Sequence, residues 1–118
     1  MKLRIQSGSI RLRLKQAEVK TLVQGGEVRE ECPTAPMALV YALRPSEAAA
    51  MTATFAEGLL TVHLPAVWLT HWDTDDRVGF DETDGGLRLL VEKDWKCVNP
   101  AAPSDNEDCF ENPVGCHE

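Results

Sequence analysis

The sequence lacks a long hydrophobic run and has few aromatic residues, which make up 6% of the chain. No stretch approaches the ~18 consecutive apolar residues that a membrane-spanning helix requires. Charged residues interrupt the N-terminal segment, so it does not have the apolar core of a signal peptide. No internal repeat or low-complexity tract is evident. We therefore expect one soluble, cytoplasmic domain with no membrane association.

The common sequence motifs of catalysis are also missing. The chain has no glycine-rich phosphate loop, no GxGxxG motif and no serine or cysteine in a nucleophile elbow. His71 lies two residues before Asp73, and a carboxylate can orient a histidine for acid–base work. A small enzyme that uses His71 is therefore an alternative hypothesis. Without a paired catalytic signature, we expect a binding domain rather than an enzyme.

The composition is that of a globular protein, with 43% hydrophobic and 26% charged residues among 118. The net charge of −7 argues against sequence-independent nucleic-acid binding, which needs a dominant basic surface. The charge is unevenly distributed: residues 1–20 hold six Lys or Arg and one acidic residue. A basic first segment therefore belongs to an otherwise acidic chain.

Residues 2–6 and 9–14 alternate between apolar and polar side chains, the period of a strand with one buried face. Ser7 and Gly8 between them suit a tight turn, so we predict a hairpin. Lys2, Arg4, Arg11 and Arg13 then project from its polar side.

Further short strands and two helices follow. Apolar residues at helical spacing predict a helix over residues 15–24, which Gly25 and Gly26 end. Pro65 suits the first turn of a second helix, over residues 65–72. About eight strands in hairpin spacing predict an α+β domain: a mainly antiparallel curled sheet or a partly open β-barrel, with two helices and an irregular C-terminal arm.

The chain divides by composition at about residue 94. We expect residues 1–94 to form a single α+β domain. Residues 95–118 are acidic and contain several prolines and three cysteines. We expect them to form an arm that packs on the same domain, across the basic side of the first hairpin.

The basic side of that hairpin is the candidate ligand site. Arginine binds phosphate or carboxylate through two parallel hydrogen bonds, so Lys2, Arg4, Arg11 and Arg13 can hold a small anionic ligand or an acidic protein partner. Arg88 lies on the polar side of a later strand and can join them. The alternative is that these cations are solvated or paired with acidic residues of the chain, since one face of an antiparallel sheet is normally polar.

The C-terminal arm offers a possible zinc site, formed by Cys97, Cys109, Cys116 and His117. Structural zinc sites usually bring two cysteines within a tight turn, and this spacing provides no such pair. A Cys109–Cys116 disulfide and free thiols are the alternatives. We therefore expect no cofactor, with zinc as the alternative.

Two segments resemble a family of short uncharacterised bacterial proteins. Residues 9–14 read SIRLRL, and residues 91–97 read VEKDWKC, with Asn112-Pro113 beyond them. These segments are similar to the beginning and end of that family. The resemblance implies a bacterial domain of unknown function, and it carries over no activity and no catalytic residue.

Overall fold

The computed structural model describes residues 1–94, which form eight strands, one α-helix and one 3-10 helix. The elements are β1 (Lys2–Gln6), β2 (Ser9–Leu14), α1 (Gln16–Val23), β3 (Val28–Cys32), β4 (Leu39–Ser46), β5 (Thr52–Ala56), β6 (Leu59–Pro65), η1 (Ala66–Leu69), β7 (Gly79–Asp84) and β8 (Leu87–Lys93). The predicted first hairpin is therefore present as β1 and β2.

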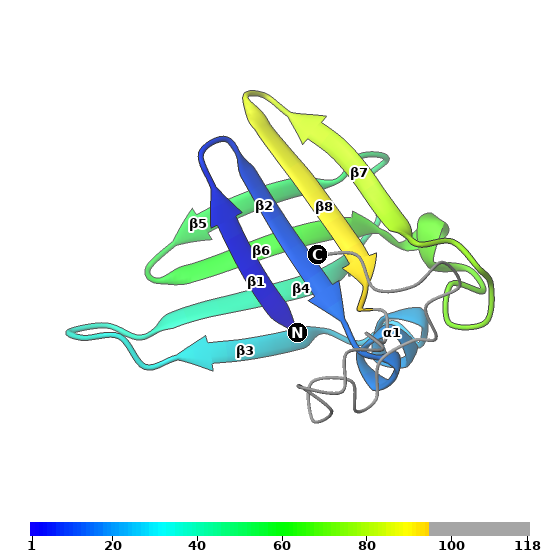
Figure 1. Ribbon diagram of the computed structural model, residues 1–118, viewed down its shortest axis with the longest axis horizontal. Helices are drawn as coiled ribbons and strands as arrows, with labels where there is room; N and C mark the ends of the chain where they lie inside the picture. The colour runs from blue at the N-terminus through cyan, green and yellow to red at the C-terminus, as the bar shows by residue number, and fades with distance from the viewer. Residues whose placement is uncertain (95–118) are drawn as a thin grey trace, which may run out of the picture.

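The strands form two four-stranded sheets. Sheet A has the order β1-β2-β8-β7, and sheet B has the order β3-β4-β6-β5. Within each sheet two antiparallel hairpins meet through their second strands, which pair in parallel: β2 with β8, and β4 with β6. The strands of sheet A run across those of sheet B (Figure 1).

The expected α+β fold class is confirmed, but the predicted barrel is wrong. Each sheet keeps two edge strands, and the sheets do not close. Each sheet has one apolar side, and the two apolar sides cover each other, which buries them without closure. The antiparallel prediction holds for four of the six strand pairings. Parallel pairing of β2 with β8 joins distant segments, which hairpin spacing does not reveal.

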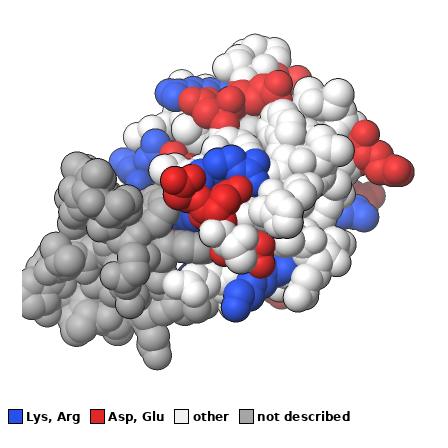
Figure 2. Space-filling model, turned by 90° about the vertical axis from the view of Figure 1, so that its right-hand side faces the viewer, with Lys and Arg blue, Asp and Glu red and all other residues white. Residues whose placement is uncertain are grey.

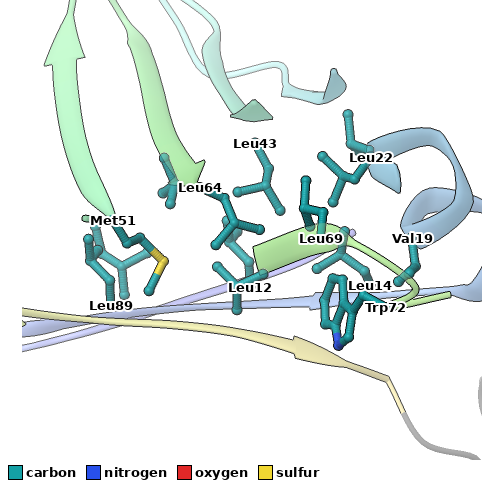
Figure 3. Close-up of a cluster of buried hydrophobic side chains, with 14 of the residues drawn as sticks. Leu12, Leu14, Val19, Leu22, Leu43, Met51, Leu64, Leu69, Trp72 and Leu89 are labelled. Carbon is teal, nitrogen blue, oxygen red and sulfur yellow. The ribbon is translucent and has the colours of Figure 1, made fainter. Parts of the chain in front are cut away.

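The core lies between the two sheets, with the helical segments at one side (Figure 3). Alternate residues of β2 point into it, and Leu12 and Leu14 are fully buried. The helix α1 contributes Val19 and Leu22, three residues apart on one face. Its first turn is closed by the Glu18 carboxylate, which accepts a hydrogen bond from the backbone N–H of Lys15 at 2.9 Å.

The second predicted helix is wrong beyond its first turn. Only Ala66–Leu69 is helical, as a 3-10 turn. His71 has a left-handed backbone, with φ of 63°, which no helix continues through. The Arg77 guanidinium donates to the carbonyl oxygens of Trp68 and Thr70, at 2.7 and 2.8 Å. These carbonyls therefore bind a side chain instead of the next turn of a helix.

The structure contains an internal repeat that the sequence did not reveal. The order hairpin, helix, hairpin occurs twice: β1 to β4 around α1, and β5 to β8 around η1. β1 and β2 correspond to β5 and β6 at a constant offset of fifty residues, with matching registers. Each sheet combines the first hairpin of one repeat with the second hairpin of the other.

Hydrogen bonds between the sheets follow the same repeat. The Met1 nitrogen lies 3.2 Å from Glu30 Oε1, and the backbone N–H of Met51 donates to Glu82 Oε1 at 2.6 Å. Met1 and Met51 precede the first strand of each repeat, and Glu30 and Glu82 lie in its third strand. Each repeat is therefore tied by the same kind of contact.

Candidate anion-binding face

The outer face of sheet A, which points away from the core, carries the predicted ligand residues. The strand register sets its side chains in three rows across β1, β2, β8 and β7: Lys2, Arg13, Glu92 and Gly79; Arg4, Arg11, Leu90 and Asp81; Gln6, Ser9, Arg88 and Thr83. We call the five cations of these rows the basic face: Lys2, Arg4, Arg11, Arg13 and Arg88. The structure thus brings all four predicted residues together, and Arg88 joins them.

Within β1 and β2 the cations stand directly opposite one another. Lys2 pairs with Arg13, and Arg4 with Arg11. Like charges opposite each other destabilise a sheet. Glu92 offsets part of this repulsion: its Oε1 lies 3.4 Å from Arg11 Nε and 3.9 Å from Arg13 Nε. One carboxylate therefore serves two arginines.

The remaining acidic neighbours lie at the margins of the face. Arg88 donates two hydrogen bonds to the Asp81 carboxylate, at 3.1 and 2.7 Å. These bonds hold the pKa of Asp81 below its ordinary value and raise that of Arg88. Lys2 Nζ lies 3.1 Å from Asp94 Oδ2. Both pairs leave the centre of the face to the arginines of β1 and β2.

Three groups on or beside this face have incomplete contacts within residues 1–94: Arg4, Arg11 and Asp94. Arg4 is exposed and makes no ion pair with a carboxylate of that part of the chain. Arg11 Nε and Asp94 Oδ2 are shielded from solvent, yet neither forms a hydrogen bond of good geometry with a described residue. Buried polar atoms are normally hydrogen-bonded, so these atoms mark an incomplete set of contacts.

Sheet B shows what the same positions look like without a basic face. At the offset of fifty residues, Lys2, Arg4, Arg11 and Arg13 correspond to Thr52, Thr54, Thr61 and His63. The pairs Thr52–His63 and Thr54–Thr61 face each other as the cations do. On that sheet Arg29 and Arg44 both pair with Glu27, at 2.7 and 3.2 Å. The architecture therefore does not require cations here.

On the side of the molecule that carries β7 and the loop after η1, basic and acidic side chains lie next to one another (Figure 2). Arg77 Nε donates to Asp75 Oδ2 at 2.6 Å, and Lys93 Nζ donates to the Asp75 carbonyl oxygen at 2.6 Å. Burial raises the pKa of Asp75, but hydrogen bonds and charge from Arg77 outweigh burial and lower it. This cluster holds the loop rather than presenting free charge.

Lys93 is a buried ionisable residue that the sequence motifs did not single out. It is 2% exposed, with its ammonium 5.8 Å from the centre of the Trp72 ring. Burial lowers the pKa of Lys93, and Asp75 opposes that shift in part. The alternation of β8 could have predicted this burial, because Leu89, Val91 and Lys93 are alternate residues on the same inward side of the strand.

The histidine alternative gains no support from the geometry. His71 is exposed, and no hydrogen bond or ion pair joins its side chain to Asp73 in the described part of the chain. His63 Nε2 lies 3.3 Å from Thr54 Oγ1 on the outer face of sheet B. The structure therefore shows no oriented acid–base pair within residues 1–94, and the enzyme alternative stays untested.

The zinc hypothesis lies outside the described residues, because Cys97, Cys109, Cys116 and His117 all follow residue 94. Within residues 1–94, no group of three or more His, Cys, Asp or Glu side chains is placed to hold a metal ion. Cys32 is an exposed free thiol. None of the helices described is long and apolar enough to span a bilayer. Zinc therefore stays a prediction.

Comparison with known proteins identifies a family and no activity. The model of a family of unknown function, DUF7009, matches residues 1–114. No curated protein matches the chain, and no solved structure does. The resemblance to a domain of unknown function is thus confirmed.

Proposed function

The chain belongs to the DUF7009 family of unknown function, and from its geometry we propose that it is a binding module that recognises an anionic ligand through the basic face. The ligand carries at least two phosphate or carboxylate groups. One group is held between Arg4 and Arg11, and the other beside Arg13 and Lys2.

The observation that carries this proposal is the contrast between equivalent positions of the two sheets. Sheet B tolerates Thr and His where sheet A has Lys and Arg. Cations opposite one another oppose folding, since like charges across a ladder repel. A feature that the fold does not need, and that acts against stability, is typical of a functional site.

The side chains present have the chemistry for this role. The arginine guanidinium matches the two oxygens of a carboxylate or phosphate, and such charge-assisted bonds contribute about 1.5–3 kcal/mol each. Leu90 lies between Arg11 and Asp81 in the middle row and is buried, at 8% exposure, so the proposed ligand contacts the charged side chains around it. Glu92 holds the two central arginines until a stronger acceptor replaces it.

The test is calorimetric titration of the full chain with pyrophosphate and, separately, citrate, at low ionic strength and pH 8. The double variant Arg11→Thr with Arg13→His installs the residues that sheet B already carries. We expect its affinity to fall about 100-fold, the equivalent of roughly 2.7 kcal/mol, for loss of two charge-assisted contacts. The stronger of the two probes identifies phosphate or carboxylate as the preferred group.

The matched control is Arg29→Thr with Arg44→Thr, which removes two cations from the outer face of sheet B. Its net charge changes by the same amount, and its affinity should stay at the wild-type level. Absence of binding by either probe to wild type, or an equal loss in the control, would overturn the proposal.

A further inference from the structure

We propose that the chain's own acidic segment, residues 95–118, binds the basic face and competes there with the anionic ligand. This inference rests on the proposed function for its regulatory meaning. The docking itself is a separate physical claim and can be tested without a ligand.

The point at which the segment begins favours this site. β8 is one of the four strands that form the face, and the chain leaves it at Asp94. The backbone N–H of Asp94 donates to the Leu14 carbonyl oxygen at 2.8 Å, at the end of β2. The Asp94 carboxylate lies 3.1 Å from Lys2 Nζ. The segment therefore starts at the row of Lys2 and Arg13.

Charge complementarity supports the same occupant. Residues 95–118 hold five acidic residues and one lysine, a net charge of −4. The acidic residues are Asp105, Glu107, Asp108, Glu111 and Glu118. Among residues 1–94, eleven Lys or Arg face fourteen Asp or Glu, so the basic face is a local excess on a mildly acidic domain. An acidic segment is repelled by much of that domain and attracted by this face.

The length of the segment allows the contact. Four strands spaced ~4.8 Å apart make a face roughly 15 Å wide. Asp105 follows Asp94 by eleven residues, which reach up to ~36 Å when extended. Tethering at the edge of the face gives the acidic residues an effective concentration on the order of millimolar. A contact of modest intrinsic affinity is then well populated, and a free ligand can still displace it.

The incomplete contacts of Arg4 and Arg11 support the acidic segment as the group that binds the basic face. Arg4 has no carboxylate partner within the described residues, and the shielded Arg11 Nε lacks a hydrogen bond there. Carboxylates of the acidic segment supply the acceptors that both arginines need. The same contacts offset the cross-strand repulsion between Arg4 and Arg11.

The first measurement places the segment directly. The full chain with Cys32→Ser, Cys97→Ser and Cys116→Ser is labelled with a nitroxide at Cys109, and paramagnetic broadening of backbone amide signals is recorded. We expect stronger broadening at Arg4, Arg11 and Arg13 than at the equivalent Thr54, Thr61 and His63. The difference should disappear in 1 M NaCl, where the screening length is ~3 Å. Equal broadening of the two sheets overturns the docking.

The second measurement tests competition and keeps all four cysteines. The variant Asp105→Asn, Glu107→Gln, Asp108→Asn and Glu111→Gln is titrated with pyrophosphate beside wild type. We expect its affinity to be roughly tenfold higher, because the tethered competitor is weakened. An unchanged affinity overturns the competition. If neither protein binds pyrophosphate while the broadening is specific to sheet A, the proposed function fails and the docking stands.

Discussion

Sheet A and sheet B have the same strand order and matching registers, yet their outer faces differ in charge. Both sheets bury alternating apolar residues, such as Leu12 with Leu14 and Val62 with Leu64. The side chains that face solvent are under no such constraint. The shared strand order and the need to bury a core thus explain the apolar residues of the inner faces. They do not explain the cations on the outer face of sheet A, for which we propose a function.

The helical segments of the two repeats differ in another way. In α1 a regular helix brings Leu22 into the core, and after the short turn η1 the chain brings Trp72 to the corresponding place. The indole fills the space with a larger side chain, and its Nε1 donates to the Arg77 carbonyl oxygen at 3.0 Å. Where the first repeat has the regular helix α1, the second repeat has the short turn η1, followed by the large side chain of Trp72 and a loop that hydrogen bonds hold in place.

The largest effect we predict comes from removing that residue. Trp72→Ala should lower the free energy of unfolding by about 3–5 kcal/mol, and Leu22→Ala by about 2–5 kcal/mol. Urea denaturation measures both. Trp72 should be the more costly loss because its hydrogen bond disappears as well. If Trp72→Ala does not fold, Trp72→Phe should still unfold at lower urea than wild type. A smaller effect at Trp72 than at Leu22 would contradict the equivalence of the two positions.

A second prediction concerns Gly79, at the end of the row that contains Glu92. A Cβ at Gly79 would lie 2.1 Å from the Val91 carbonyl oxygen and 2.7 Å from the Glu92 Cα, so backbone atoms have to move. Gly79→Ala should lower the free energy of unfolding by about 1–3 kcal/mol. Glu27→Ala, at the residue directly before β3, removes only surface ion pairs with Arg29 and Arg44 and should change it far less. Equal effects would show that the two sheets do not differ there.

A third prediction sharpens the contrast in ligand binding. Glu92 occupies two arginines of the basic face, at 3.4 and 3.9 Å from Arg11 and Arg13. Glu92→Gln should raise the affinity for pyrophosphate about tenfold, the equivalent of about 1.4 kcal/mol. Glu31→Gln, on the outer face of sheet B, is the control and should not raise it. Weaker binding after Glu92→Gln would mean that this carboxylate organises the site instead of competing for it.

The smallest effect that we predict is a change in stability that tests the repulsion between Arg4 and Arg11. Arg4→Thr removes one of two arginines that stand opposite each other and installs the residue found at the equivalent position of sheet B. In a background with Asp105→Asn, Glu107→Gln, Asp108→Asn and Glu111→Gln, which removes the acidic residues proposed to pair with Arg4, thermal or urea unfolding in low salt should show a gain in the free energy of unfolding of about 0.2–1 kcal/mol. Arg44→Thr removes a cation that is paired with Glu27, and it should give no gain. A loss of stability in Arg4→Thr would indicate that Arg4 supports the fold.

The first hairpin, which depends only on neighbouring residues, was predictable from the sequence. Strict alternation over residues 2–6 and 9–14 gave the first hairpin and put four cations on one side of it. The neighbours of those cations could not be predicted, because Glu92 and Leu90 arrive through parallel pairing of β2 with a strand far along the chain. Period-two patterns specify which side is buried, but not which strands meet.

The repeat escaped detection for a related reason. Its halves share hydrophobic character at positions such as Ile10 and Leu60, but most of their polar residues differ. The second helix was predicted too long because its end depends on Arg77, a residue distant from the helical pattern that donates to the carbonyls of Trp68 and Thr70. Tertiary hydrogen bonds of this kind leave no periodic trace in the sequence.

The parallel pairing of β2 with β8 also has a consequence for how the protein is made. Sheet B can assemble once β6 has been synthesised, since all its strands lie between Val28 and Pro65. Sheet A has to wait for β8, and until then the first hairpin lacks its central partner. Contacts between such distant segments slow folding, because a long loop closes before they form. During translation, β1 and β2, which carry four of the five cations of the basic face, therefore leave the ribosome before the other strands and are among the last to be completed.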